Sequence, residues 1–427
     1  MAVVLFATFV VLLILSVPVS YALGLSSLAA LMYKGGIPVT ILAQRMFTGL
    51  DSFPLLAVPF FILAGALMET GGISARLIRF ASVLVGHIRG GLGMVVVLST
   101  MMFSGLSGSS AADTAAIGSI MIPQMTKRGY PRGLATATVA ASGGFAILIP
   151  PCITMIIFGV TANVSIGYLF FAGFLPAFMM GAGMMAAMYW IARRYKLPQE
   201  PRAACGEVAT AAIRAVPPLL MPVIVLGGIR FGAFTPTEGA IVAVFYSALL
   251  SMVFYRELSI RDIPPVLVTT AKLTGIVMLL VGMSSTFAWV VASQRIPQLV
   301  TEAMLGISTN PMVFLFMVNI LFLIVGTFMD PTPAIIILVP LLFPVSQQLG
   351  IDEIHFGTVV VANLGIGLVT PPVGVVLYVA ASVGKTTIEE VSRHLLPFFA
   401  VLILTLFVIT YLPDVTLFVP RLFGYDG

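Results

Sequence analysis

Residues 146–158, AILIPPCITMIIF, place Pro150-Pro151 in the middle of an apolar stretch. Residues 367–379, GLVTPPVGVVLYV, repeat this arrangement 221 residues later around Pro371-Pro372. Proline removes a backbone donor and clashes with the preceding helical turn, so both stretches are predicted to be helices that unwind at their centres. Two interrupted apolar segments at corresponding positions of two halves are typical of the binding site of a secondary transporter.

The same shift of 221 residues aligns further residues that control where helices break. These pairs are Gly105 with Gly326, Pro123 with Pro344, Gly129 with Gly350, Gly144 with Gly365, and Pro176 with Pro397. Glycine and proline interrupt regular helices, so their alignment indicates an internal structural repeat rather than a shared apolar composition.

The composition is that of an integral membrane protein. The chain is 59% hydrophobic and 9% charged, whereas soluble domains carry about 25% charged residues. The apolar runs long enough to span a bilayer are 2–22, 53–68, 168–192, 215–229, 239–254, 273–292, 312–329 and 395–412. The first run lacks a preceding basic region and is too long for a cleaved signal, so it is predicted to be a span. The lipid bilayer is the expected environment, and no nucleic-acid partner is expected.

The placement of positive charge predicts the topology. Basic residues are concentrated at 76–89, at 127–132 and at 193–214, and the positive-inside rule places these regions in the cytoplasm. Under the 221-residue shift the basic loop TKRGYPRG becomes QQLGIDEI, which is acidic. Opposite charge on equivalent loops predicts that the two halves are inverted in the membrane; the alternative is chance over one short loop.

The predicted fold is therefore an all-α integral membrane protein built from two inverted repeats. Each repeat should contain spanning helices, an interfacial arm helix, a re-entrant hairpin and a Pro-Pro-interrupted helix. The predicted boundaries are a first repeat at 1–192, a cytoplasmic linker at 193–214 and a second repeat at 215–427. The hairpins are expected at about 91–126 and 312–347, the interrupted helices at about 133–160 and 355–384, and the arms at 71–89, 256–272 and 295–309.

The first hairpin carries polar residues where a span should be apolar. The sequence SGLSGSSAAD, residues 104–113, offers hydroxyls and backbone carbonyls suited to a monovalent cation; the alternative is close helix packing through small residues. Asp113 and Asp330 would each lie at membrane depth, where a carboxylate costs at least about 2.5–3.5 kcal/mol. They therefore indicate function, although either could also cap a half-helix.

Catalysis is not indicated. Gly105-Leu106-Ser107-Gly108 matches a motif of intramembrane serine proteases, but His87, His355 and His394 all lie near charged loops rather than beside it. The chain has no phosphate-binding loop for ATP, and nothing supplies the repeated rings that line a channel. No enzyme activity is expected.

The motifs resemble a known family. The run SGSSAADTAAIGSIMIP at 107–123, the stretch GLVTPPVG and the two-half plan resemble the large, DctM-like membrane subunit of tripartite ATP-independent periplasmic (TRAP) transporters. More distantly, they resemble divalent-anion/sodium symporters, which offer the alternative of a stand-alone transporter.

The resemblance implies a sodium-driven elevator importer in the cytoplasmic (inner) membrane of a bacterium or archaeon. A periplasmic binding protein would deliver an acidic solute, such as a sialic acid or C4-dicarboxylate. A small four-helix membrane subunit would brace the scaffold. Because the chain starts directly with its first apolar run, this subunit is expected to be a separate chain.

The resemblance also implies two sodium sites and a substrate site. The first sodium site would comprise Ser104, Ser107, Ser109, Asp113 and Gly144, and the second Gly326, Thr327, Asp330, Gly365 and Thr370. The substrate would lie between them, near Ser109, Thr154 and Ser165. Neither tip motif contains Arg or Lys to hold a carboxylate, so either half-helix dipoles or an arginine from elsewhere must do so.

Overall fold

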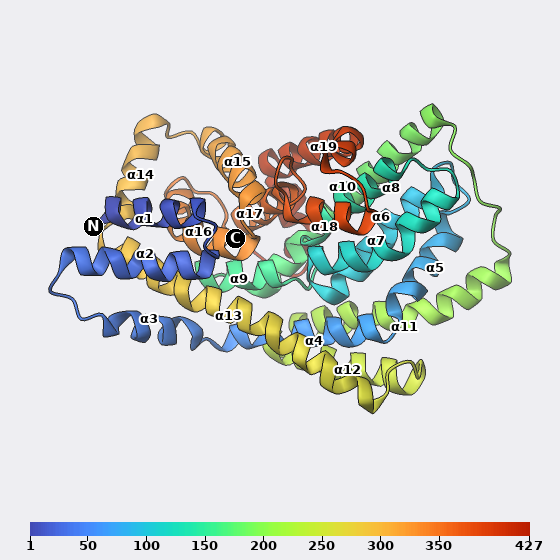
Figure 1. Cartoon of the computed structure of the whole chain (residues 1–427), viewed down its shortest axis with the longest axis horizontal. Coiled ribbons are helices and arrows are strands. Elements are labelled where there is room, and N and C mark those ends of the chain that lie inside the picture. The colour runs from blue at the N-terminus through green and yellow to red at the C-terminus, as the bar shows by residue number, and fades with distance from the viewer.

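The computed structural model describes residues 1–427, and its regular elements are all helices (Figure 1). In chain order they are α1 (Ala2–Ile14), α2 (Val19–Lys34), α3 (Thr40–Leu50), η1 (Phe53–Leu56), α4 (Ala57–Thr70), α5 (Ile73–Val85), α6 (Gly91–Ser107), α7 (Ser110–Lys127), α8 (Arg132–Ala146), α9 (Ile153–Ala162), α10 (Ile166–Tyr195), α11 (Cys205–Arg230), α12 (Pro236–Leu249), η2 (Leu250–Phe254), η3 (Ile260–Asp262), α13 (Ile263–Ser293), α14 (Ile296–Ile307), α15 (Pro311–Phe328), α16 (Pro331–Gln348), α17 (Glu353–Gly367), α18 (Val375–Gly384), α19 (Ile388–Tyr411) and α20 (Pro413–Leu422).

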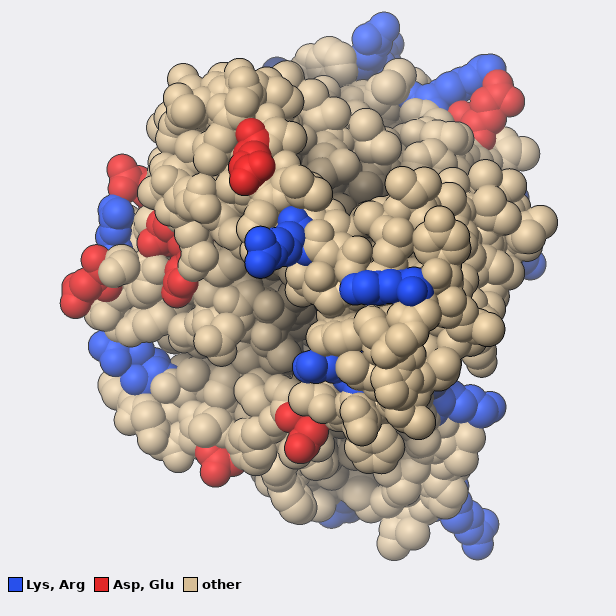
Figure 2. Space-filling view, turned by 90° about the vertical axis from the view of Figure 1, so that its left-hand side faces the viewer, with Lys and Arg blue, Asp and Glu red and all other residues tan.

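The helices have the length and surface of a membrane protein. Eight helical stretches are long and apolar enough to cross a bilayer. Seen from the end that carries the N-terminus, charged side chains are few and scattered over an otherwise uncharged surface (Figure 2). The predicted all-α membrane fold is confirmed.

The two halves repeat the same elements in register. Helix α7 and its counterpart α16 begin and end 221 residues apart, and so do α8 and α17. The following helices, α9 and α18, are offset by one residue more because the second break is longer. In Figure 1, α6, α7 and α8 lie to the right of centre, whereas α15, α16 and α17 lie to the left. The repeat predicted from glycine and proline spacing is thus present in the helix boundaries.

Each predicted hairpin turns at a residue suited to the turn. Gly108 ends α6 with φ +66°, a left-handed conformation that glycine adopts without strain, and Ser109 caps α7 by accepting a hydrogen bond from the Ala112 amide at 3.5 Å. In the second half, Asp330 precedes α16 and Pro331 occupies its first turn, where the missing N–H has no cost.

The two halves interlock at their interrupted helices. α7 packs against α18, and the equivalent pair α16 and α9 also pack together. At the centre Gly144 of α8 faces Gly365 of α17; a Cβ on Gly365 would lie 2.4 Å from the Gly144 carbonyl oxygen. Because equivalent residues touch each other, the pseudo-twofold axis that relates the halves passes between α8 and α17.

The predicted N-terminal span at 2–22 is wrong. The chain forms two helices there, α1 and α2, which pack side by side. Ser16 has φ 60° and Pro18 precedes α2, so a left-handed residue and a proline divide the apolar run before it can cross as one helix.

The arm predicted at 256–272 is also wrong, because that segment leads into the 31-residue helix α13. Its prolines lie in the first turn of α13, where they are compatible with a helix. Short separate helices do occur at the other two predicted arms, as α5 and α14. The irregular part of the predicted linker 193–214 is confined to residues 196–204, because α10 extends to Tyr195 and α11 starts at Cys205.

A partly exposed ion pair connects α5 to the loop after η2. Arg76 Nη2 lies 2.5 Å from Glu257 Oε1, its Nη1 donates to the Gly72 carbonyl at 2.8 Å, and its guanidinium lies 4.0 Å from the centre of the Tyr255 ring. The hydrogen bond from Arg76 lowers the pKa of Glu257 below the ordinary carboxyl value of 4.5. A lowered pKa contributes stability above the unfolded-state value, and this contribution is lost as the pH falls through the folded-state value.

We therefore expect Glu257→Gln to lower the free energy of unfolding at pH 7 by up to about 1 kcal/mol, since the pair is partly exposed. The difference from the unchanged protein should disappear near pH 3. Thermal unfolding at both pH values measures this difference. Glu389→Gln, which breaks the more exposed pair with Arg393, is the control and should have a smaller effect. An equal loss at both pH values would contradict an electrostatic role.

Candidate functional site

A cavity of about 200 Å³ lies on the pseudo-twofold axis, where the two hairpin tips meet the two helix breaks. Its lining residues include pairs that are related by the repeat: Ser109 with Asp330, Ser110 with Pro331, Ala111 with Thr332, and Ile147 with Leu368. Equivalent segments of the two halves thus line the cavity together.

Four helices begin at this cavity. The first turns of α7, α9, α16 and α18 all supply lining residues, at Ser110, Ile153, Pro331 and Val375 respectively. A helix N-terminus presents free amides and a partial positive charge, which favours an anion. The lining contains no Lys or Arg. The lining thus offers half-helix dipoles rather than a basic side chain to an anion, and it also includes the carboxylate of Asp330.

A polar cluster fills the first hairpin tip beside this cavity. Asp113 on α7 is fully buried, and the Ser107 hydroxyl donates to its Oδ1. The Ser109 amide donates to Ser107 Oγ at 3.2 Å. Ser104 reaches across to the first break, where its hydroxyl donates to the Ala146 carbonyl at 2.7 Å. These contacts join the turn of the hairpin to the end of α8.

Three buried oxygens in this cluster have no hydrogen-bond partner: Asp113 Oδ2, Ser110 Oγ and Thr114 Oγ1. Positions i, i+3 and i+4 share one face of a helix, so the three oxygens lie on the same side of α7. A buried carboxylate oxygen without a partner is costly, and a cation bound there would relieve that cost. The donor set of one carboxylate and two hydroxyls suits a hard monovalent cation. The sequence analysis missed Ser110 and Thr114, although their spacing from Asp113 could have indicated them.

The glycine predicted for this cluster faces elsewhere. Gly144 contacts α17 at the axis, whereas its neighbour Gly143 faces α7, where an added Cβ would lie 2.0 Å from Thr114 Oγ1. The link between the first tip and α8 is therefore made through Gly143 and the Ala146 carbonyl. The helix period explains the difference, since adjacent residues point about 100° apart.

The second hairpin tip is less polar. Asp330 is exposed and lines the cavity, without a capping hydrogen bond. The Thr327 hydroxyl donates to the Leu323 carbonyl of its own helix at 2.9 Å, and the Thr370 hydroxyl, in the second break, donates to the Ile366 carbonyl of α17 at 2.8 Å. Gly326 packs against α17, where an added Cβ would lie 3.2 Å from Gly367 Cα.

The two intramembrane aspartates are not equivalent. The 221-residue shift pairs Asp330 with Ser109, the capping residue of α7, and pairs Asp113 with the apolar Ala334 of α16. Asp113 is buried within its tip, whereas Asp330 opens into the cavity. The two tips therefore offer different environments, and only the first contains a buried carboxylate with a free oxygen.

Of the three residues predicted near the substrate, Ser109 and Thr154 line the central cavity but Ser165 does not. Ser165 caps α10, accepting from the Tyr168 amide at 3.5 Å, and lines a separate cavity of about 170 Å³. Ten residues separate Thr154 from Ser165, and the eight of them that belong to α9 carry the chain about 12 Å away.

A second cavity of about 350 Å³ lies further along the same helices. Val277 of α13 lines the central cavity, and Val281 and Ser285, one and two turns later, line the second. The same progression runs along α9 from Thr154 to Thr161 and along α16 from Thr332 to Pro340. One face of each of three helices therefore runs from the central cavity into the second.

The chain matches a protein-family model and several named relatives. Residues 6–415 match the model of the family described as "Tripartite ATP-independent periplasmic transporter, DctM component". The chain is 42% identical to a C4-dicarboxylate TRAP transporter large permease protein of Pseudomonas aeruginosa, with 94% of each chain covered. It is 40% identical to the 2,3-diketo-L-gulonate TRAP transporter large permease protein of Escherichia coli, again over 94% of each.

Two further matches are a longer relative and a solved structure of low sequence identity. The chain is 40% identical to the isethionate TRAP transporter permease protein DctMQ of Oleidesulfovibrio alaskensis, covering 97% of this chain and 66% of that protein. Among solved structures, the YdaH transporter of Alcanivorax borkumensis superposes with a TM-score of 0.61 at 14% identity, covering 87% of this chain and 86% of that one. At this identity the likeness concerns the fold.

Proposed function

Because the chain belongs to the DctM component of the tripartite ATP-independent periplasmic transporters, a family of transporters rather than enzymes, we propose that it carries a carboxylate-bearing solute across the inner membrane, driven by sodium. A C4-dicarboxylate or a sialic acid is the expected type of solute. The three named relatives are described as transporting C4-dicarboxylate, 2,3-diketo-L-gulonate and isethionate, all of which are organic acids.

The observation that carries the proposal is the central cavity at which four helices begin. Four helix N-termini can hold the solute's carboxylate without a fixed cation. The hydroxyls of Ser109, Ser110 and Thr154 line the same cavity and can orient its other polar groups. Binding that relies on dipoles rather than ion pairs leaves the solute easier to release.

The oxygens left without a partner in the first tip support the proposed sodium coupling. Sodium bound by Asp113 Oδ2 and its neighbours on α7 would neutralise the buried carboxylate one turn from the cavity. The N-terminus of α7 would then face the solute anion without the opposing charge of Asp113, and the second ion proposed below would offset the charge of Asp330, which also lines the cavity. By linkage, sodium and solute each raise the affinity for the other by the same factor. A second sodium ion is proposed at Gly326, Thr327, Asp330, Gly365 and Thr370, as the resemblance to the family implies.

An elevator motion would carry this core past the rest of the chain. The interlocked hairpins and interrupted helices form the moving block, and α5 and α14 are the proposed arms. Helix α4 packs against both α12 and α13, and these three helices form the proposed scaffold. The second cavity, between α3, α13 and the core helices α9 and α16, is the proposed solute route from the central cavity.

The partners proposed are a periplasmic binding protein and a small four-helix membrane subunit. Uptake of labelled C4-dicarboxylates and sialic acids into proteoliposomes tests this arrangement, with each component omitted in turn. Uptake should require all three components. Uptake by this chain alone would instead establish the stand-alone divalent-anion/sodium symporter.

Blocking the second cavity should stop transport without preventing binding. We expect Thr161→Phe to reduce uptake at least about tenfold, because the larger side chain would fill the proposed route, while solute-dependent thermal stabilisation of the purified protein is kept. Thr210→Phe, on the exposed part of α11, serves as the control. Undiminished uptake by Thr161→Phe would show that the solute takes another route.

A further inference from the structure

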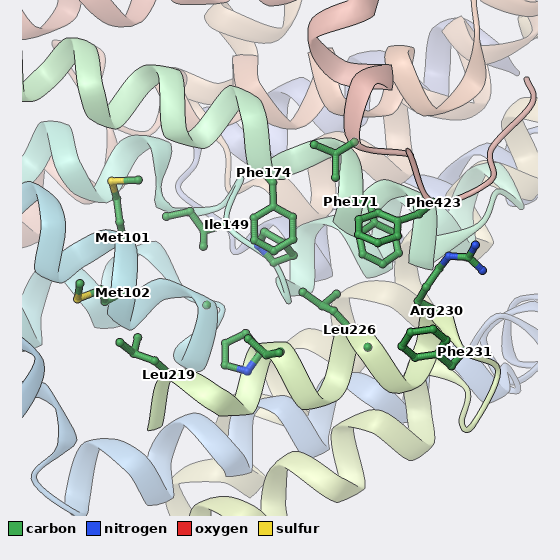
Figure 3. A pocket seen from close by; sticks show the side chains of 16 residues that line it. Met101, Met102, Ile149, Phe171, Phe174, Leu219, Leu226, Arg230, Phe231 and Phe423 are labelled. Atoms are coloured by element: carbon green, nitrogen blue, oxygen red, sulfur yellow. The ribbon is translucent and has the colours of Figure 1, made fainter. Parts of the chain in front are cut away.

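A cavity larger than the central one lies outside the proposed transport site. It is a groove of about 610 Å³ between α11 and the core helices α6 and α10, closed at one end by the C-terminal segment (Figure 3). Its walls are apolar apart from one charged side chain, Arg230. A soluble organic acid would find no hydrogen-bonding partners along these walls, so the groove suits a different ligand.

One face of α11 forms the floor of the groove. Leu219, Val223, Leu226 and Arg230 follow one another at spacings of four, three and four residues, which places them on one side of the helix. From Leu219 to Arg230 this stripe is about 16 Å long. In Figure 3 the apolar side chains line the slot and Arg230 lies at its end, beside Phe231 and Phe423.

Arg230 is free to bind an anion. It takes part in none of the ion pairs of the structure and donates no hydrogen bond to another residue. Its guanidinium lies 6.0 Å from the centre of the Phe423 ring and is otherwise exposed. It lies at the end of α11 opposite the basic linker 196–204, and thus where a span reaches a membrane surface.

The rim of the groove faces the surroundings of the protein. Val223 is 64% exposed and Phe231 87% exposed, although both are apolar. Exposed apolar side chains on a spanning helix face hydrocarbon. The groove is therefore open to lipid along its length.

We propose that this groove binds one acyl chain of an anionic phospholipid, with its phosphate paired to Arg230. An apolar slot that ends in a single unpaired cation is complementary to a hydrocarbon chain that ends in a single anion. The position requires only a bilayer, so the proposal does not depend on which solute is transported or on sodium coupling.

The bound chain would lie against the first hairpin. Gly105 and Pro150 both line the groove, and a Cβ on Gly105 would lie 3.0 Å from the Pro150 carbonyl oxygen and 3.5 Å from Pro222 of α11. The lipid would thus contact α11 and the core at once. A ligand that binds the folded protein in this way raises its melting temperature with concentration.

The test uses the purified full chain in a neutral detergent, titrated with phosphatidylglycerol or with phosphatidylcholine of the same acyl chains. Native mass spectrometry counts bound lipid, and thermal unfolding measures stabilisation. Phosphatidylglycerol should bind at least about tenfold more tightly than phosphatidylcholine, as expected for one charge-assisted contact.

Two variants separate the headgroup from the chain. Arg230→Gln should bind both lipids equally and weakly. Gly227→Leu should lose both, because nothing lies within 4 Å of an added Cβ there and the new side chain would fill the groove. Gly275→Leu, at an equally open position of α13 outside the groove, should bind like the unchanged protein. Equal binding of the two lipids by the unchanged chain, or unchanged selectivity in Arg230→Gln and Gly227→Leu, would overturn the proposal.

Discussion

Asp113→Ala is expected to abolish sodium-driven uptake while leaving the protein folded in the membrane. The variant removes the only buried carboxylate of the first tip, and with it the one charged oxygen that has no partner. Losing a charge-assisted contact of about 3 kcal/mol lowers ion affinity more than a hundredfold. The folded state should not suffer in the absence of sodium, since the variant also removes an uncompensated buried charge.

Two measurements distinguish this loss of ion binding from misfolding. The melting temperature of the unchanged protein should rise when potassium is replaced by sodium, and that of Asp113→Ala should not. Asp414→Ala, which removes an exposed carboxylate paired with Arg421, should retain both uptake and the sodium response. Full uptake by Asp113→Ala would refute a sodium site in the first hairpin.

Gly365→Ala is also expected to have a large effect. It should lower both the stability of the protein and its transport activity. The added Cβ would lie 2.4 Å from the Gly144 carbonyl oxygen, a backbone atom that can move only with α8. Overpacking of this kind costs about 1–3 kcal/mol, and here it would separate the two halves at their axis. Both helix breaks would then shift relative to the cavity between them.

A graded series tests the steric origin of this effect. Gly144→Ala should be milder, because its added Cβ meets the Val369 side chain at 2.9 Å and the Gly365 carbonyl at 3.1 Å. Gly275→Ala, in open space on α13, should be neutral or slightly stabilising. Thermal unfolding and uptake are measured for each variant. Equal stability of all three would contradict a close contact at the axis.

The repeat and its breaks could be predicted from the sequence because glycine and proline act locally. Pro150-Pro151 and Pro371-Pro372 both lie at helix breaks, so their spacing predicted the helix correspondence that the boundaries of α8 and α17 show, whereas Pro217-Pro218 lie within α11 without dividing it. The apolar runs likewise predicted the longer spans. The same local rule could have divided 2–22, since Pro18 lies within it.

The site was less predictable because it depends on which faces of the helices meet. Gly144 was predicted in the first site, and only the packing of α8 shows that its neighbour Gly143 faces Thr114. Ser165 was placed near the solute although ten residues, eight of them in α9, separate it from Thr154. The apolar groove along α11 has no motif at all, because its walls come from four separate helices.

The most direct test of the account is uptake by the complete system under an imposed sodium gradient. With the binding protein and the small subunit present, an inward sodium gradient should accumulate the organic acid above its external concentration, and a sodium ionophore should abolish this accumulation. Accumulation at the same rate with potassium on both sides, or with a proton gradient alone, would contradict sodium coupling at the hairpin tips.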